Sequence, residues 1–282
     1  MAGSQPGGSH KSNSRLKRLL LGEFSFKRLV KSVVSIYVLF GVAIYFLADR
    51  LMFHPETSSP WTTAPPLTIR TRDGVALPAL YLSNPKATYT ILFSHGNAED
   101  IRDIAPRLEW IRQVGFSVFA YDYRGYGTGV GVPTEENAYA DIDAAYDYLT
   151  TGLGVAPGRI VAYGRSIGGG PAVDLASRTP LAGLVLESTF VTAFRVRTRI
   201  PILPFDMFRN IDKIDRVQGP VLVMHGTDDE IIPAWHGRAL FEKAKEPKLA
   251  LWVEGAVHDD VAEAAGPHYA ETLRRFADLL PK

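Results

Sequence analysis

Short apolar runs alternate with helical patterns over most of this chain, and that alternation restricts its fold more than any other feature. Runs that are apolar along nearly their whole length form strands buried on both faces of a parallel sheet. Six of them lie at residues 89–93, 117–121, 160–163, 183–186, 221–224 and 249–253. We therefore expect an α/β fold, with a mostly parallel central sheet covered by helices on both faces.

Helical patterns fill most of the connections between these runs. They lie near residues 100–114, 135–150, 168–178, 234–245 and 261–280. Before the first run, alternating segments at 67–72 and 75–82 flank a Gly-containing turn and predict a hairpin. Residues 191–215, rich in Arg, Phe and Pro, interrupt the rhythm and predict a small cap.

The N-terminal part differs from the rest in charge and hydropathy. Residues 1–53 hold eight basic and two acidic side chains, so a net charge of +1 combines a +6 segment with a −5 body. Residues 1–28 are basic, start with a Gly- and Ser-rich stretch and are expected to be flexible. Residues 32–48 carry no charge and approach the shortest length that crosses a bilayer as a helix. We expect a transmembrane anchor at 29–53, followed by one domain at 54–282.

Two other interpretations of the hydrophobic segment stay open. A cleaved signal peptide is disfavoured because the basic leader is long and no clear A-x-A site follows. The other interpretation is that the segment forms a buried helix of the body. If the segment spans a membrane, the basic residues before it place the N-terminus in the cytoplasm. The body would then be extracytoplasmic, which in a Gram-negative bacterium is the periplasm.

Composition excludes several function classes. The chain has no cysteine, which rules out disulfides, Cys-ligated metals and a thiol nucleophile. A net charge near zero argues against a nucleic-acid partner, which usually requires a basic face.

A G-x-S-x-G motif follows the predicted strand at 160–163. It reads Gly164-Arg165-Ser166-Ile167-Gly168 and precedes a predicted helix, which is the context that this motif requires. A serine at so sharp a turn needs neighbours without Cβ atoms, because the turn is strained and crowded. Ser166 is therefore the predicted nucleophile, with a helix N-cap as the structural alternative.

A serine nucleophile needs a base and a group that orients the base, in the order Ser, acid, His. His258 lies between the last predicted strand and the last predicted helix, so we expect it to be the base rather than a surface histidine. The strand at 221–224 is followed by Asp228, Asp229 and Glu230. Successive loop residues cannot all face one imidazole, and spacing alone leaves the choice among these three open.

The loop after the strand at 89–93 reads Ser94-His95-Gly96-Asn97. An oxyanion hole of this type takes one N–H from this loop and one from the residue after the nucleophile. The backbone amides of Asn97 and Ile167 are the predicted donors. We expect His95 to support the loop rather than to take part in chemistry.

Taken together, these motifs resemble the α/β-hydrolase family, in particular membrane-anchored α/β-hydrolase-domain depalmitoylases and serine aminopeptidase-like hydrolases. The resemblance runs from about residue 65 to the end. It rests on LFSHGNAED (92–100), YDYRGYG (121–127), YGRSIGGGPA (163–172), LVLESTF (184–190), HGTDDEIIP (225–233) and VEGAVHDD (253–260). The family pattern H-G-x-x-D-x-x-[VI]-P places the acid on Asp229. LMFHP (51–55) also resembles the segment that follows the anchor in these proteins.

The resemblance implies a serine hydrolase that cleaves carboxylic esters or thioesters through an acyl-enzyme on Ser166, with no metal or cofactor. Its expected substrates are small acyl esters, thioesters or lipids. The depalmitoylases are tethered by lipidated N-terminal cysteines, which this chain lacks, so their activity does not transfer directly. Two alternatives are a peptidase or amidase and a non-catalytic, membrane-tethered binding protein.

The predicted cap bears on the substrate. Its apolar side chains could line an acyl pocket and its three arginines could face anionic headgroups, or the cap could be ordinary packing under a solvated basic face. The apolar residues are Ile200, Ile202, Leu203, Phe205, Met207 and Phe208, and the arginines are Arg195, Arg197 and Arg199.

Overall fold

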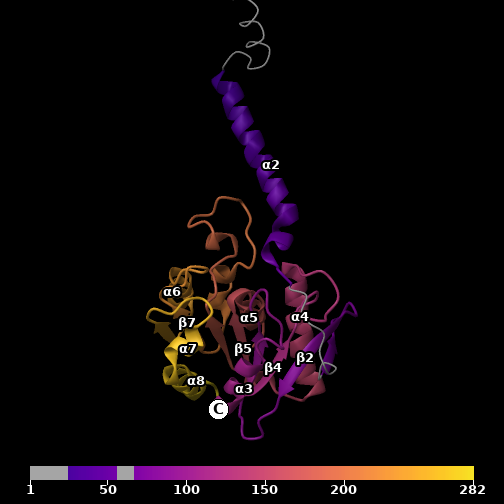
Figure 1. The fold of residues 1–282 in the computed structure, drawn as a ribbon, viewed down its shortest axis with the longest axis vertical. Helices are drawn as coiled ribbons and strands as arrows, with labels where there is room; N and C mark the ends of the chain where they lie inside the picture. Colours follow the sequence, from indigo (N-terminus) through magenta and orange to yellow (C-terminus); the bar gives the residue numbers. More distant parts are fainter. Residues whose placement is uncertain (1–24, 56–66) are drawn as a thin grey trace, which may run out of the picture. The chain divides into compact units, whose positions relative to one another are not determined.

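The computed structural model describes residues 25–55 and 67–282. The chain divides into two units, residues 1–48 and residues 49–282. The second unit is built on an eight-stranded sheet in the order β1-β2-β4-β3-β5-β6-β7-β8 (Figure 1). Its strands are β1 (Leu67–Arg70), β2 (Ala76–Leu82), β3 (Thr90–Ser94), β4 (Ser117–Tyr121), β5 (Ile160–Arg165), β6 (Gly183–Glu187), β7 (Val221–Gly226) and β8 (Lys248–Val253).

The sheet is parallel from β4 to β8, while β1 pairs antiparallel with β2 and β2 antiparallel with β4. The predicted hairpin and the six predicted strands are therefore confirmed, but the expected burial is wrong for β8, which lies at the edge of the sheet and is half-buried at five of its six residues. Strand β3 lies between β4 and β5, so the chain turns to opposite sides of β3 in succession. In an open parallel sheet, ligands bind outside the carboxyl ends of the strands at such a switch point. There Ser94, at the end of β3, pairs in register with Gly164 of β5.

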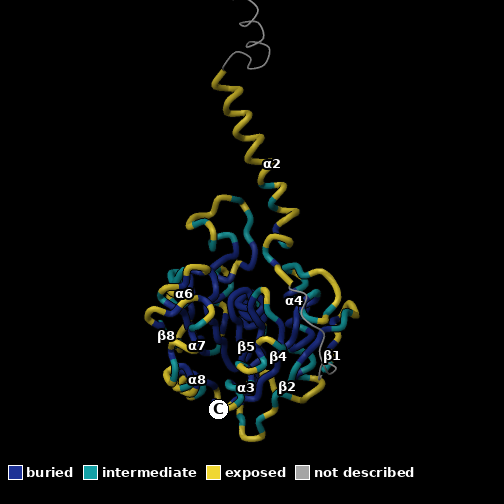
Figure 2. Tube along the Cα trace, viewed as in Figure 1, coloured by how far each residue is buried: buried dark blue, intermediate teal, exposed yellow. Residues whose placement is uncertain are grey.

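Helices cover both faces of the sheet, as predicted (Figure 1). Helices α3 and α8 pack against one another over the face that carries Ile91 and Phe93, and α4, α5 and α6 belong to the opposite face. Figure 2 shows the strands as the buried centre of this unit. The helices are α3 (Ala105–Val114), α4 (Glu135–Asp147), α5 (Gly169–Arg178), α6 (Trp235–Lys243), α7 (Val261–Ala265) and α8 (Pro267–Leu279).

Two predicted helices differ from the observed ones. The single helix expected at 261–280 is two helices, because Gly266 adopts a left-handed conformation (φ 52°) and Pro267 supplies no backbone N–H to continue the ladder. The helix expected from residue 100 begins at Ala105. Before it, the Asp100 carboxylate accepts a hydrogen bond from the Arg102 backbone N–H (2.8 Å), which stabilises a turn rather than a helix.

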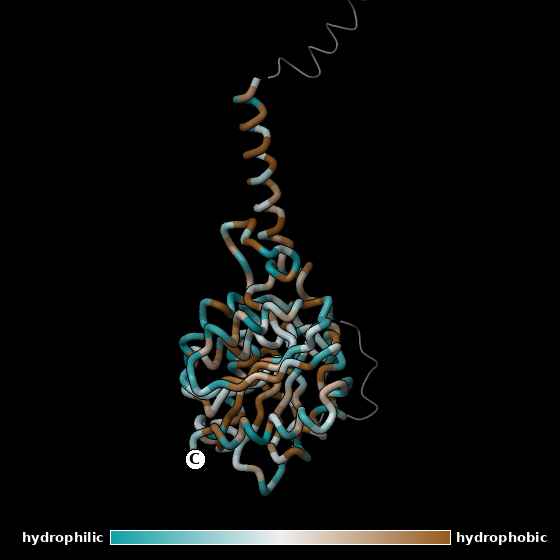
Figure 3. The backbone as a smooth tube through the Cα atoms, turned by 90° about the vertical axis from the view of Figure 1, so that its left-hand side faces the viewer, coloured by the Kyte–Doolittle hydropathy of each residue, from teal (hydrophilic) through white to brown (hydrophobic). Residues whose placement is uncertain are grey.

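The first unit contributes most of one long apolar helix, α2 (Phe26–Met52). Its hydrophobic side chains are largely exposed, with Phe26 and Phe46 at 75% and 76%. Figure 3 shows apolar residues along its length. Among the described residues, α2 is the helix long and apolar enough to cross a membrane. The predicted anchor at 29–53 falls mainly on α2, whereas most of the flexible segment predicted at 1–28 lies outside the described residues.

The predicted cap at 191–215 is a series of short turns between β6 and β7. It contains the 3-10 turns Phe194–Val196 and Asn210–Asp212 and most of a third. Its apolar side chains divide into two groups. Met207 and Phe208 are buried, whereas Ile200 and Ile202 are 69% and 51% exposed.

Candidate active site

The turn between β5 and α5 is as sharp as the G-x-S-x-G motif predicts. Ser166 adopts φ 52°, a left-handed conformation that is unfavourable for a residue with a Cβ atom. A Cβ atom on Gly164 would overlap the carbonyl of Gly168, and one on Gly168 would overlap the carbonyl of Ser94. Both glycines are therefore required by close backbone approach. The turn presents the Ser166 hydroxyl at the carboxyl edge of the sheet.

Loops from three strands bring the three predicted catalytic side chains together. His258 Nε2 lies 3.0 Å from Ser166 Oγ, and His258 Nδ1 lies 2.8 Å from Asp229 Oδ2. The other carboxylate oxygen of Asp229 accepts hydrogen bonds from the backbone N–H groups of Ile231 and Ile232. This arrangement holds the carboxylate and, through it, the imidazole ring.

The structure distinguishes among the three adjacent carboxyl groups after β7. Asp229 is buried and faces His258, while Asp228 and Glu230 are exposed. Burial alone would raise the pKa of Asp229, but hydrogen bonds with His225 and His258 hold that pKa well below its usual range. An ionised carboxylate at this position favours a proton on the facing nitrogen of His258 and leaves the other nitrogen to accept one from Ser166.

The loop after β3 places Asn97 at the same edge of the sheet. Within the described residues, the backbone N–H of Asn97 donates no hydrogen bond to the protein, and the backbone N–H of Ile167 belongs to the 3-10 turn that begins at Ser166. His95 is fully buried and lies against the rings of Tyr123 and Tyr126. This position fits the supporting role predicted for His95.

An ion-pair network that the sequence did not predict lies next to Ser166. The Arg165 guanidinium is buried and pairs with Glu99 of the loop after β3 (2.9 Å) and with Asp259 of the loop after β8 (2.6 Å). Glu99 in turn accepts a hydrogen bond from the Gly96 backbone N–H. One side chain thus connects the three loops that carry Ser166, Asn97 and His258. In the sequence, Arg165 is marked only by its place inside the G-x-S-x-G motif.

A second set of buried titratable side chains, Asp122 and His95, lies at the loop after β3. Asp122 accepts a hydrogen bond from the Ile101 backbone N–H (2.8 Å) and lies 3.6 Å from His95 Nε2. Burial raises the pKa of Asp122 to about 8 and lowers the pKa of His95. Both shifts favour a neutral pair, with Asp122 protonated and the imidazole uncharged.

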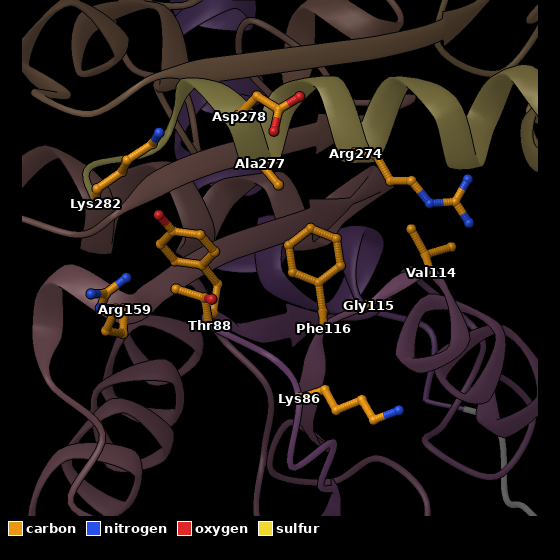
Figure 4. Close-up of a pocket in the computed structure, with 11 residues that line it drawn as sticks. Lys86, Thr88, Val114, Gly115, Phe116, Arg159, Arg274, Ala277, Asp278 and Lys282 are labelled. Carbon is orange, nitrogen blue, oxygen red and sulfur yellow. The ribbon is translucent and has the colours of Figure 1, made fainter.

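One open pocket of about 730 Å³ lies away from these residues (Figure 4). Phe116 and Tyr89 lie at the amino ends of β4 and β3, and Ala277 lies on α8. The basic side chains around this pocket are Lys86, Arg159, Arg274 and Lys282. Because Ser166 lies at the carboxyl ends of the strands, this pocket is not the substrate site of the predicted chemistry.

The sheet order, the strained serine and its hydrogen-bonded histidine place the protein among α/β-hydrolases of the serine-hydrolase type. Residues 85–203 match the family model described as serine aminopeptidase, S33. Alpha/beta hydrolase domain-containing protein 17B of Homo sapiens is 44% identical over 211 residues, which is 73% of each chain, and that of Xenopus tropicalis matches equally. The chain therefore belongs to the family of α/β-hydrolase domain-containing proteins.

Solved structures of other α/β-hydrolases share the fold. An esterase of Pyrococcus furiosus superposes with a TM-score of 0.67 over 80% of this chain and 97% of its own, at 18% identity. A monoacylglycerol lipase of Paleococcus ferrophilus superposes with a TM-score of 0.56 over 72% of this chain and 98% of its own, at 22% identity.

Proposed function

We propose that this protein is a serine hydrolase that cleaves carboxylic esters or thioesters through an acyl-enzyme on Ser166. One observation carries the proposal: the hydrogen-bonded chain from Ser166 through His258 to Asp229, at 3.0 and 2.8 Å. A lone serine hydroxyl is a poor nucleophile at neutral pH, and an adjacent base oriented by a third group activates it.

The proposed reaction has two halves. His258 takes the proton from Ser166 Oγ as the oxygen attacks the acyl carbonyl, and the backbone amides of Asn97 and Ile167 stabilise the oxyanion. His258, held by Asp229, then donates that proton to the leaving alcohol or thiol, and an acyl-enzyme remains. Water activated by His258 releases the acid and restores the serine.

An apolar acyl group is the substrate class that the site favours. Two exposed hydrophobic residues follow or precede triad residues in the sequence: Ile231 (54% exposed) comes two residues after Asp229, and Val257 (43% exposed) comes directly before His258. Ile200 and Ile202 add apolar surface in the cap. The fold neighbours include an esterase and a lipase. The resemblance to depalmitoylases extends the proposal to thioesters.

Helix α2 is proposed to anchor the domain in a membrane. Its exposed apolar side chains favour a bilayer over a place in the core, and the basic residues before it favour a cytoplasmic N-terminus and an extracytoplasmic domain. Protease digestion of intact cells or spheroplasts tests the orientation. An intact N-terminus on the membrane-bound protein would exclude a cleaved signal peptide.

A graded substrate panel tests the proposed activity. We expect the full-length protein to hydrolyse p-nitrophenyl esters and acyl thioesters and to prefer longer chains over acetate, and Ser166→Ala to lose both activities. Selective cleavage of aminoacyl anilides, with no ester turnover, would instead favour the peptidase indicated by the description of the family model. No Ser166-dependent turnover of any of these compounds would contradict the proposal.

A further inference from the structure

The segment that follows α2 contacts the loop that carries Asn97. We call residues 49–54 the post-anchor segment. The Asn97 side-chain amide donates to the Met52 carbonyl (2.7 Å), and its side-chain oxygen accepts from the His54 backbone N–H (2.9 Å). The Tyr126 hydroxyl donates to the same oxygen. The Ala98 backbone N–H also donates to this oxygen (3.2 Å), so two of the four hydrogen bonds that hold this side chain come from the post-anchor segment.

Two further contacts fix the post-anchor segment itself. The Phe53 ring is 4% exposed and packs edge-on against Tyr126 and Phe208, with centroid distances of 6.5 and 6.0 Å. The Asp49 carboxylate accepts a hydrogen bond from the backbone N–H of Glu135, the first residue of α4 (3.0 Å). A buried aromatic ring between two bonded ends makes this segment an integral part of the domain.

The loop needs this support because its own conformation is unfavourable. Ala98, directly after Asn97, has φ 55°, a region that residues with a Cβ atom rarely adopt. On one side, Glu99 and Arg165 hold the loop through Gly96. On the other side, the Asn97 side chain is held by Tyr126 and the post-anchor segment. An oxyanion donor works only when it is preorganised, and positional errors near 1 Å reduce catalysis strongly.

We propose that the post-anchor segment is a positioning element of the oxyanion hole, acting through the Asn97 side chain to aim the Asn97 backbone N–H at the substrate oxygen. This inference rests on the proposed function, because it assigns a role within the same reaction. It also means that the residues that end the anchor helix and the residues that bind the transition state form one structural unit.

Full-length Asn97→Ala removes the side-chain hydrogen bonds and keeps the backbone N–H. We expect kcat for p-nitrophenyl butyrate to fall about 10- to 100-fold, less than the roughly 10²–10³-fold typical of a lost oxyanion donor. KM should change less than threefold. A trifluoromethyl ketone, which forms a tetrahedral oxyanion on the serine, should lose affinity in proportion to kcat/KM. Asn137→Ala is the matched control, because among the described residues the Asn137 side chain bonds only the exposed Val132 carbonyl in the loop before α4.

A second pair of variants tests the post-anchor segment directly. Phe53→Ala should reproduce the loss of kcat and of ketone affinity, and Phe53→Leu, which keeps the site apolar, should restore most of both. This pair decides the question if Asn97→Ala does not fold. Wild-type kcat and ketone affinity in folded Asn97→Ala or Phe53→Ala would overturn the inference. Absence of any Ser166-dependent activity in the wild type would instead overturn the proposed function.

Discussion

Two loops meet at the proposed active site, and they are held in opposite ways. The turn after β5 depends on its own residues, since Gly164 and Gly168 touch and Ser166 takes the strained conformation between them. The loop after β3 depends on distant residues. Arg165 holds this loop through Glu99, which lies 66 residues away in the sequence. Met52 holds it through Asn97, which lies 45 residues away.

The difference explains what each loop can tolerate. A turn set mainly by its own glycines should fail through an added Cβ atom and should respond less to the loss of a single distant side chain. A loop held by distant side chains should keep its fold when one contact is lost, but its backbone amide should no longer be oriented toward the substrate oxygen. Variants of the two loops should separate loss of the turn from misorientation of the backbone amide.

The largest effect is expected at Asp229. This residue belongs to neither the turn after β5 nor the loop after β3, so its variant shows a loss of catalysis that leaves both of them unchanged. Asp229→Asn should lower kcat by about 10⁴-fold, because a neutral amide neither fixes the His258 tautomer nor stabilises the imidazolium. Asp228→Asn, at the exposed neighbour, should stay within twofold of wild type in the same ester assay. A larger loss in Asp228→Asn than in Asp229→Asn would contradict the assignment of the acid.

Gly168→Ala should disrupt the turn after β5. A Cβ atom at this position overlaps the carbonyls of Ser94 and His95, so we expect a loss of about 1–3 kcal/mol or more in the free energy of unfolding, together with loss of activity. Gly158→Ala is the control, because a Cβ atom there meets nothing within 4 Å. Denaturant unfolding measures both. Wild-type stability and activity in Gly168→Ala would refute the close approach.

Arg165→Met tests the support of the loop after β3. Removing one partner of a buried ion pair typically costs about 3–5 kcal/mol, and the released loop should also lower kcat. Adding Glu99→Gln should recover part of the stability, because the uncompensated carboxylate is then gone. A kcat equal to wild type in folded Arg165→Met would show that Ser166 and Asn97 do not depend on this network.

A different kind of effect, on stability alone, is a pH dependence that arises from Asp122. Its pKa is raised to about 8, so between pH 4 and pH 8 the unfolded chain loses this proton while the folded protein keeps it. Stability from this group therefore falls as pH rises, by at most about 1.4 kcal/mol per pH unit, and levels off above pH 8. Asp122→Asn removes this contribution, whereas groups such as His95 remain in both proteins. If the free energy of unfolding changes with pH to the same extent in wild type and in Asp122→Asn between pH 5 and pH 8, Asp122 makes no such contribution.

The same contrast explains which features the sequence predicts. Buried strands, the serine turn and the position of His258 follow from local patterns, because apolar runs and glycine spacing act over a few residues. Asp229 required the family pattern, since spacing alone left three carboxyl groups equivalent. The Arg165 network and the post-anchor contacts join residues far apart in the chain, so no local pattern indicates them. The break before α8 could have been predicted from Gly266-Pro267.

Labelling with a fluorophosphonate probe is the sharpest test of Ser166 as the nucleophile, because such probes react with serines activated by a neighbouring base. We expect the full-length wild type to bind one probe per chain on Ser166 and folded Ser166→Ala to bind none. No labelling of the folded wild type, or undiminished labelling of Ser166→Ala, would contradict it.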